Sequence, residues 1–287
     1  MPDAKRKQKP RVSIIGTGRL GTALSVALLH SGYAIQSLVA RRAQTARQAA
    51  SLLDKKPQVL AAKQLSSLRP ADLFLITVPD DQIASVAAEL SGLEFDATAL
   101  HTSGALSADV LEPLRNLGWH TGSVHPLISV SDTSTKLAGA FWSVEGDRVA
   151  LRMGKQIVRD LQGQSFSISS EDKPLYHAAA VMASGNVVAL FDVALEMLMK
   201  CGLSRKQARD ILTPLIASTV RSLETKDPAH ALTGTFSRGD VETVKRHLAA
   251  LQQSDLADAL DLYRLLGRRS LKVTGKHPQI TQILKSV

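Results

Sequence analysis

The chain has 287 residues, of which 44% are hydrophobic and 21% are charged, and its net charge at pH 7 is +9. This length suits two domains of ordinary size, and the hydrophobic content is sufficient for a sizeable core. A single cysteine, Cys201, excludes an internal disulfide and favours a cytoplasmic location. Aromatic residues make up only 4%, which disfavours stacking platforms for single-stranded nucleic acid.

Much of the positive charge lies at the start of the chain. The first eleven residues carry one acid, Asp3, against five cations: Lys5, Arg6, Lys7, Lys9 and Arg11. We interpret residues 1–10 as a disordered basic leader and predict no nucleic-acid partner, with a patch for an anionic partner as the alternative. The leader runs into Val12–Gly16 without a long apolar stretch or cleavage site, so no secretory signal is predicted.

Residues 11–170 alternate β-branched runs with helical patterns, which is typical of a parallel sheet with crossover helices. The predicted strands are Arg11–Ile15, Ile35–Val39, a short one near Val59, Leu73–Val78, Ala97–His101, Ser123–Pro126, Phe141–Val144 and Ser165–Ile168. The predicted helices between them are Leu20–Leu29, Ala43–Leu53 and Asp147–Leu161. The expected first domain is therefore an α/β Rossmann domain over residues 11–170.

After Ser170 the pattern predicts helices only, at about 174–200, 204–224, 240–253 and 255–273. Residues 171–287 are expected to form an all-α domain. Its most apolar segment, Ala178 to Met199, is interrupted by polar residues that a bilayer would leave unsatisfied. We therefore predict the buried helix of a soluble protein and no membrane partner.

The segment Gly16-Thr17-Gly18-Arg19-Leu20-Gly21 follows the first strand and opens the first helix. In this context the pattern GxGxxG predicts a dinucleotide-binding loop. Gly16 permits the tight turn, Gly18 lets the backbone approach a pyrophosphate, and Gly21 lets helix and strand pack closely. The helix N-terminus adds free N–H groups and a positive dipole end. We assign the whole segment, including Thr17, Arg19 and Leu20, to the cofactor.

The end of the second strand indicates which dinucleotide binds. An NAD site usually places a carboxylate there for the ribose hydroxyl, whereas this chain has Arg41 and Arg42. Two guanidinium groups can form charge-assisted hydrogen bonds to the 2′-phosphate of NADP. The sequence therefore predicts NADP(H), with an exposed basic turn as the alternative.

The carboxyl ends of the later strands carry further candidates. Thr77, Val78 and Pro79 follow the fourth strand and should line the cofactor path, together with Ser103 after the fifth. His101 and His125 end small-residue segments and are candidate substrate residues, with a structural role as the alternative. No cluster of His, Cys and Asp has the spacing of metal ligands, so no metal is predicted.

The helix that opens the second half has a polar face. At 100° per residue, Lys173, His177 and Ser184 share one side of it, and these are the predicted catalytic residues. Hydrogen bonds between domains or between the subunits of a dimer are the alternative. Asn186 joins this face only if the helix breaks near Ser184, and Arg238 is placed to bind an anionic group or to tether its loop. Both are candidate substrate residues.

These motifs together resemble a family. Gly16–Gly21, Thr77–Asp81, His101–Gly104, His125–Leu127, Tyr176–Ser184 and Thr233–His247 recur in this order in uncharacterised bacterial proteins. Those proteins pair a Rossmann-like NADP-binding domain with a helical domain of unknown function that resembles the C-terminal domain of 6-phosphogluconate dehydrogenase. The resemblance implies a homodimer through the helical domain. One departure from related hydroxyacid dehydrogenases is that Lys173 is followed four residues later by His177 instead of an asparagine.

The leading hypothesis is an NADP-dependent oxidoreductase that transfers a hydride between the cofactor and a small carbonyl or imine. His177 would donate the proton, since an imidazole titrates near neutral pH, and Ser184 and Lys173 would orient the substrate. The alternative is a non-catalytic protein that senses NADP, which predicts a polar helix face closed by contacts within the protein.

Overall fold

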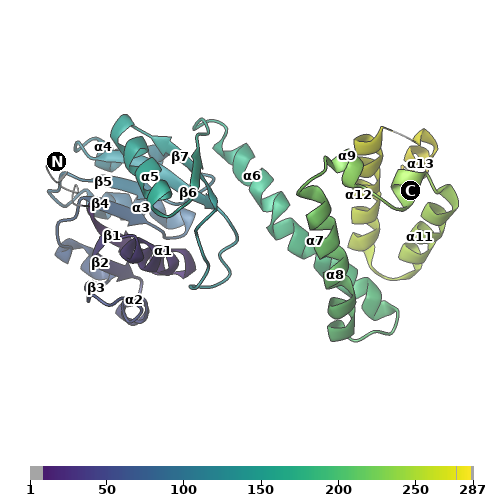
Figure 1. The fold of residues 1–287 in the computed structure, drawn as a ribbon, viewed down its shortest axis with the longest axis horizontal. Coiled ribbons are helices and arrows are strands. Elements are labelled where there is room, and N and C mark those ends of the chain that lie inside the picture. Colours follow the sequence, from purple (N-terminus) through teal and green to yellow (C-terminus); the bar gives the residue numbers. More distant parts are fainter. Residues whose placement is uncertain (1–8, 276, 286–287) are drawn as a thin grey trace, which may run out of the picture. The chain divides into compact units, whose positions relative to one another are not determined.

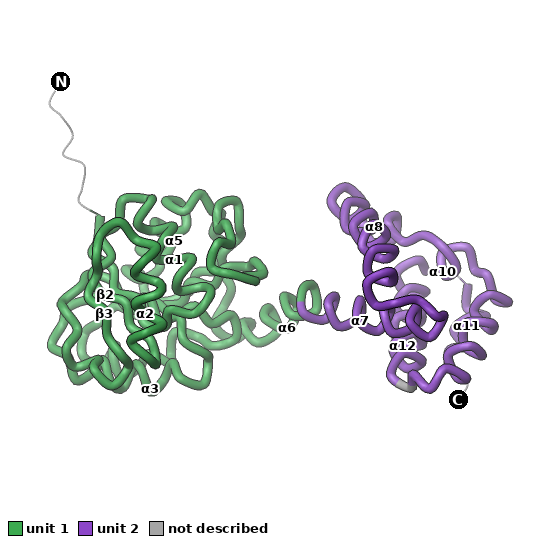
Figure 2. The backbone as a smooth tube through the Cα atoms, turned by 90° about the horizontal axis from the view of Figure 1, so that it is seen from below, with its two compact units in different colours: residues 1–184 green, residues 185–287 purple. Residues whose placement is uncertain are grey.

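The computed structural model describes residues 9–275 and 277–285. The chain divides into two compact units, residues 1–184 and 185–287, which Figure 2 shows in different colours. The predicted domain boundary near residue 170 precedes this division and stays a prediction. Residues 1–8 of the predicted leader lie outside the described residues.

The first unit is built on one sheet (Figure 1). Its strands are β1 (Arg11–Ile15), β2 (Ala34–Ala40), β3 (Gln58–Ala61), β4 (Leu73–Ile76), β5 (Thr98–His101), β6 (His120–Leu127), β7 (Phe141–Gly146) and β8 (Gln164–Phe166). Their order across the sheet is β3-β2-β1-β4-β5-β6-β7-β8. All neighbouring pairs are parallel except β6 and β7. The predicted strands are confirmed, but a hydrophobic pattern does not specify strand direction, so the antiparallel pair was not foreseen.

Helices cover both faces of this sheet. They are α1 (Arg19–His30), α2 (Ala43–Ala50), α3 (Asp80–Leu90), α4 (Glu112–Arg115) and α5 (Arg148–Asp160), with short 3₁₀ turns η1 (Ala62–Ser67) and η2 (Ala108–Leu111). The last helix of the unit, α6 (Lys173–Ala183), extends away from the sheet, and most of its residues are exposed (Figure 1). The four residues of β4 are fully buried. Leu73 and Leu75 pack with α1 and α5, whereas Phe74 and Ile76 pack with α3. Because both faces of β4 are covered by helices, all of its residues are apolar and its sequence shows no alternation with polar residues.

The helix α3 was missed by sequence analysis. Pro79 precedes it, and two acidic residues, Asp80 and Asp81, occupy its first turn, where they suit the helix dipole. These are recognisable start signals. Its apolar residues, including Ile83 and Leu90, face the sheet.

The second unit contains helices only within residues 185–275 and 277–285, as predicted. They are α7 (Gly185–Lys200), α8 (Arg205–Leu223), α9 (Pro228–Ala231), α10 (Thr235–Arg238), α11 (Val241–Gln253), α12 (Ala257–Thr274) and α13 (Pro278–Ile283). Asp240 caps α11 by accepting a hydrogen bond from the Thr243 N–H at 3.2 Å. The helix predicted over 174–200 is interrupted, because Ser184 leaves helical geometry with φ −127° and ψ −79°.

Helices α6 and α7 form the most apolar segment of the chain. Over their combined span, Lys173–Lys200, length and composition would allow a membrane crossing, a criterion that core helices of soluble proteins also meet. Only 6% of its most apolar stretch is buried. The prediction of a buried helix is therefore wrong for this structure, and the predicted absence of a membrane partner stays a prediction.

Candidate functional site at the carboxyl edge of the sheet

The glycine loop after β1 has the geometry that its three glycines require. Gly16 has φ +107°, and a β-carbon there would lie 2.7 Å from the backbone of Thr77. A β-carbon on Gly21 would lie 1.9 Å from the Gly16 carbonyl oxygen, so α1 packs directly on the loop. Gly18, in contrast, faces open space, with no atom within 4 Å of its missing β-carbon. The open side of the loop is therefore at Gly18.

Gly18 is also the N-cap of α1, and it has no side chain to satisfy the N–H groups of the first turn. These N–H groups and the positive end of the helix dipole favour an anion. Arg19 is exposed in this turn, whereas Thr17 is 4% exposed and its hydroxyl has no partner. The loop thus offers its backbone to a ligand at Gly18.

Thr77 holds this loop from the neighbouring strand. Its hydroxyl donates to the carbonyl oxygens of Gly16 and Ile15, the latter at 3.3 Å. The side chain thus shapes the loop, and the predicted place of Thr77 along the cofactor path stays a prediction. Val78 is half-buried and Pro79 is the exposed N-cap of α3.

Arg41 and Arg42 follow the carboxyl end of β2, and Arg42 is the N-cap of α2. Both side chains are exposed. Within the described ranges neither guanidinium group has an ion pair or hydrogen bond with the protein. Two unneutralised cations therefore stand at the edge of the sheet that carries the glycine loop.

Three polar side chains lie side by side across neighbouring strands. His101 on β5 pairs in register with Ser123 on β6, which pairs with Glu145 on β7. Residues two apart in a strand point to the same face, so His125 lies on the same face as Ser123. This polar row continues the carboxyl edge that begins at the glycine loop.

The first residue of α6 meets this row. The Lys173 side chain is 1% exposed, and its ammonium donates to the Ser123 hydroxyl and to the Ser103 carbonyl oxygen at 3.3 Å. Glu145 lies 3.8 Å away. Burial lowers the pKa of Lys173, and the carboxylates of Glu145 and Asp80 oppose this shift. The Lys173 ammonium is thus bound by protein groups, and its predicted role in orienting the substrate stays a prediction.

His101 is fully buried. Its Nδ1 accepts from the Ser103 N–H at 3.2 Å, and its Nε2 faces the Ser107 carbonyl oxygen at 3.1 Å, so the proton lies on Nε2. Burial, with smaller effects of Lys173 and His125, lowers its pKa to about 3. Both ring nitrogens are used by the protein, and we assign His101 the structural role instead of the predicted substrate contact.

Ser103 shapes the turn after β5. Its hydroxyl donates to the Asp80 carboxylate at 2.8 Å and accepts from the N–H groups of Ala105 and Leu106 at 3.1 and 3.0 Å. The hydroxyl is thus used within the protein, and the predicted contact of Ser103 with the cofactor stays a prediction.

His125, Tyr176 and His177 form a second cluster beside Lys173. The Tyr176 hydroxyl lies 2.8 Å from Nδ1 of His125. The rings of His125 and His177 meet edge to face, with centroids 5.5 Å apart. Nδ1 of His177 is buried and has no hydrogen-bond partner. Burial, His177 and Lys173 together lower the pKa of His125 to about 4.

Gly104 makes this contact between rings possible. A β-carbon on Gly104 would lie 2.4 Å from Nδ1 of His177 and 2.8 Å from Nε2 of His125. Any other residue would force the rings apart. The structure thus brings together His125 and His177, which were predicted separately as a substrate residue and a catalytic residue, and Gly104, which was not predicted.

Three predicted site residues lie outside this cluster. Ser184 is exposed at the end of α6. Asn186 and Arg238 are exposed in the second unit. Their predicted roles stay predictions.

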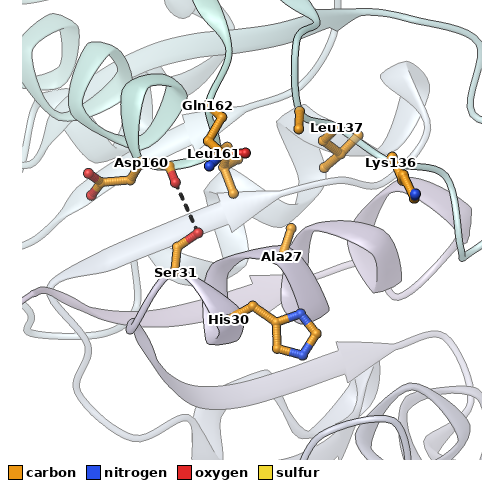
Figure 3. Close-up of a pocket in the computed structure, with 9 residues that line it drawn as sticks. Ala27, His30, Ser31, Lys136, Leu137, Asp160, Leu161 and Gln162 are labelled. Atoms are coloured by element: carbon orange, nitrogen blue, oxygen red, sulfur yellow. Dashed lines mark hydrogen bonds between the residues drawn. The ribbon is translucent and has the colours of Figure 1, made fainter.

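The first unit also has cavities away from this site. One of about 480 Å³ is formed around the C-terminal end of α1 (Figure 3). There the Ser31 hydroxyl donates to the Asp160 carbonyl oxygen at 3.0 Å, and His30 and Lys136 lie at the walls. It contains no predicted site residue. Among the described residues, no group of three His, Cys, Asp or Glu side chains is arranged to hold a metal.

Comparison with protein families accounts for most of the chain. Residues 2–126 match a Rossmann-like domain, and residues 140–270 match a domain of unknown function, DUF2520. The chain joins a Rossmann-like domain to a DUF2520 domain. This confirms the predicted family and fold class. No protein of curated function matches the chain.

Solved structures share the fold over nearly the whole chain. A candidate NADP oxidoreductase from Bacteroides fragilis is 26% identical, with a TM-score of 0.75, over 92% of this chain and 99% of its own. A protein from Thermotoga maritima is 24% identical, with a TM-score of 0.73, over 92% and 98%. A reductive aminase from Aspergillus terreus, in complex with NADPH and ethyl levulinate, is 15% identical, with a TM-score of 0.62, over 92% and 94%.

The polar site combines residues from both family matches. His101, Ser123 and His125 lie in the Rossmann-like match, whereas Lys173 and His177 lie in the DUF2520 match. The missed members of the site are Asp80, Gly104, Ser123, Glu145 and Tyr176. Two of them could have been found from the sequence. Tyr176 is adjacent to His177, a predicted catalytic residue, and Glu145 is an acid in an otherwise uncharged strand.

Proposed function

We propose that this Rossmann–DUF2520 protein is an NADP-dependent oxidoreductase that transfers a hydride between the cofactor and a small carbonyl or imine. One observation carries the proposal. The carboxyl ends of β1, β4, β5 and β6 are neighbours in the sheet, and they bear in sequence the glycine loop, Thr77, the turn 101–104 and His125. Ligands of open α/β sheets bind at this edge, where the strand order reverses beside β1.

The glycine loop suits a dinucleotide. The open side of Gly18 admits a pyrophosphate to the backbone, and the first turn of α1, with Arg19 and Leu20, surrounds it. Arg41 and Arg42 are available for a 2′-phosphate, which supports NADP over NAD. When bound, the nicotinamide supplies or accepts the hydride.

His177 is the proposed proton donor. It is half-buried, and Nδ1 is turned toward Gly104 and has no partner, which leaves Nε2 as the nitrogen available to a substrate. A general acid must reach the atom that gains the proton. The buried Lys173 ammonium donates to the Ser103 carbonyl oxygen and to the Ser123 hydroxyl, and in this proposal it holds these two segments of the site in place. Ser184 remains the proposed substrate-orienting residue.

Similar structures support the reaction class. The protein from Bacteroides fragilis and the aminase from Aspergillus terreus are described with NADP and NADPH, and this chain spans 94–99% of their lengths. The imine reductase from Myxococcus stipitatus, 17% identical with a TM-score of 0.61, is described with NAD⁺. At these identities the likeness concerns the fold, so substrate and cofactor preference rest on the site.

We also propose a homodimer through the helical unit, in the cytoplasm. Apolar side chains on α7 and α8 are exposed, among them Val188, Ile211 and Leu215. Exposed apolar surface on this scale is typical of protein interfaces. Cys201, an exposed free thiol, suits a reducing compartment.

A second candidate function is NADP sensing without turnover. It is favoured by the contacts that close part of the polar face, since Lys173 and His101 bind only protein groups. The unpartnered Nδ1 of His177 favours the enzyme, because a purely structural histidine in a buried site satisfies both nitrogens.

The deciding experiment is a screen of NADPH oxidation against small keto acids, aldehydes and imines, with NADPH binding measured in parallel. We expect binding and turnover of at least one substrate group. Tight binding with no turnover across the panel would support the sensor, and absence of binding would contradict both functions.

A further inference from the structure

The Tyr176 side chain is held against three neighbouring strands. Its hydroxyl lies 2.8 Å from Nδ1 of His125 on β6, and its ring meets Phe166 on β8 edge to face, with centroids 5.8 Å apart. Ser143 on β7, between these strands, pairs in register with both His125 and Phe166. Contacts on both sides therefore fix the phenol of Tyr176 on the ring of His125.

This contact determines where the ring proton of His125 lies. Burial raises the pKa of Tyr176, so its phenol keeps its proton. Burial, with smaller effects of His177 and Lys173, lowers the pKa of His125 to about 4, so its ring is neutral at neutral pH. A phenol is a stronger donor than a neutral imidazole, and an imidazole nitrogen is a stronger acceptor than a phenol oxygen. Tyr176 therefore donates to Nδ1, and the proton of His125 lies on Nε2.

Nε2 of His125 lies beside Gly104 at the proposed site. Among the described residues this nitrogen makes no hydrogen bond, and in contrast to Nδ1 of His177 it is not enclosed by the protein. Gly104 keeps it open, because a β-carbon there would lie 2.8 Å from it. The rings of His125 and His177 meet edge to face, with centroids 5.5 Å apart and no hydrogen bond between them. The N–H group of His125 is therefore available to a ligand beside His177.

We propose that His125 is a second catalytic residue, whose Nε2–H group donates a hydrogen bond to the oxygen of a carbonyl substrate, and that Tyr176 is the positioning residue that fixes this tautomer. The inference rests on the proposed function and deepens it, because it selects a carbonyl over an imine as the group that is reduced.

The choice of a carbonyl follows from the number of lone pairs. His125 and His177 each bring one donor to the site, and a carbonyl oxygen has two lone pairs that accept both. An imine nitrogen has one lone pair, which the proton from His177 occupies. Each N–H···O hydrogen bond spans about 2.9 Å. One oxygen can therefore bridge nitrogens of two rings whose centroids are 5.5 Å apart.

His125 keeps its proton during the reaction. As the substrate carbon receives the hydride and the C=O π electrons move to oxygen, the Nε2–H bond of an imidazolium at His177 breaks and its proton forms the O–H bond. His177 becomes neutral and takes a new proton from water. The N–H group of His125 stabilises the negative charge that develops on the oxygen, as the donors of an oxyanion hole do. The positive charge of His177 keeps His125 neutral, because two adjacent imidazolium rings repel each other.

The first test is spectroscopic and needs no substrate. In the full-length protein labelled with ¹⁵N-histidine, we expect His125 to be neutral at neutral pH, with its proton on Nε2. Tyr176→Phe should release His125 to a mixture of tautomers, whereas Tyr33→Phe, which removes the hydroxyl that donates to Asp160, should not. A proton on Nδ1 of His125 in the native protein would overturn the proposal.

The second test is kinetic and uses a carbonyl substrate from the screen. His125→Ala should lower kcat by about 10²–10³-fold, the loss typical of one oxyanion donor, with little change in the KM for NADPH. His125→Gln keeps an N–H group near the position of Nε2 and should restore part of the rate, which a merely structural role does not predict. His120→Ala on the same strand is the control. A loss that is equal in the two His125 variants, or absent from both, would contradict the proposed hydrogen bond.

The substrate screen separates this inference from the proposed function. We expect turnover of ketones or aldehydes to exceed that of imines. Turnover of imines alone would leave the proposed function standing and overturn the choice of a carbonyl. Absence of any turnover would overturn both the proposed function and the catalytic role of His125.

Discussion

The two units of this chain differ in how they bury their apolar residues. The sheet unit has an apolar core on each face, and every residue of β4 is fully buried. The helical unit has a small core around Val244, Leu271 and Ile280 on α11, α12 and α13. Its helices α7 and α8 instead expose large apolar side chains, with Val188 69% and Leu215 62% exposed.

This difference suggests that the sheet unit carries the chemical site and that the helical unit carries the surface for association. A core on both faces fixes the strands rigidly, and precise sites are best built on such elements. The glycine loop and the histidine cluster are therefore carried by the sheet unit. Apolar helices without a core need a partner surface, so assembly is expected to depend on α7 and α8. Changes in the first unit should affect chemistry, and changes in the second should affect association.

The largest effect is expected at His177. His177→Ala removes the proposed proton donor and should lower kcat by about 10²–10⁴-fold with little change in the KM for NADPH. Steady-state kinetics on the substrate found by the screen measures this, with His120→Ala as the control. Rates near those of the native protein would remove His177 from the mechanism.

The two glycines of the loop should respond differently. Gly16→Ala places a side chain at φ +107° against the Thr77 backbone, and the dihedral alone costs about 1–3 kcal/mol of unfolding free energy. Gly18→Ala should cost less, about 0.5–1 kcal/mol, because its side chain enters open space and only the poorer N-cap propensity of alanine counts against it. Yet it should weaken NADPH binding, because the pyrophosphate needs that space. Denaturation and cofactor titration separate the two effects. Normal NADPH affinity in Gly18→Ala would argue against the loop as the cofactor site.

Cofactor preference should depend on the second strand. The double variant Arg41→Ala/Arg42→Ala should weaken NADPH binding by about tenfold to hundredfold, as expected for lost charge-assisted hydrogen bonds. NADH binding should not change. Arg47→Ala, an exposed arginine of α2, serves as the control. Equal losses for both cofactors would contradict a 2′-phosphate site.

Assembly should depend on the helical unit. Leu215→Lys puts a charge on the exposed face of α8 and should raise the dissociation constant of the proposed dimer by about tenfold or more. Leu117→Lys, which changes a leucine that is 56% exposed in the sheet unit, should leave it unchanged. Sedimentation velocity measures both. A native protein that is monomeric at micromolar concentration would refute the proposed dimer.

The buried histidines should make the sheet unit sensitive to acid. The pKa is lowered to about 4 for His125 and about 3 for His101, whereas an unfolded histidine titrates near 6.5. Below pH 6.5 the unfolded chain therefore binds protons that the folded chain does not, and stability falls as the pH falls. Each histidine contributes a slope of up to about 1.4 kcal/mol per pH unit. Urea denaturation between pH 6.5 and 4 should show a smaller slope in His125→Gln than in His120→Gln.

The order of the strands, the change from an α/β half to a helical half and the glycine loop were predictable from the sequence, because each rests on a local pattern. A buried strand, a turn that only glycine allows and a helix start lie within a few neighbouring residues. The position of Arg41 and Arg42 was predictable for the same reason, since the two residues directly follow the strand that the local pattern predicts. The antiparallel β7 and the exposure of α7 did not follow, because strand direction and burial depend on what lies opposite.

The chemistry of the site was decided by the tertiary structure. Nothing in the sequence pairs Tyr176 with His125, places Glu145 behind Lys173 or gives both nitrogens of His101 to the protein. The contacts of Tyr176 and Lys173 join segments that lie tens of residues apart, whereas those of His101 depend on the shape of the turn that follows it. Together they determine which nitrogen holds a proton and which charge is buried. The residue types of a polar site are thus visible in the sequence, whereas the partner of each group, and with it its role, is set by strand register and by the contacts of Lys173, Tyr176 and His177 at the start of α6.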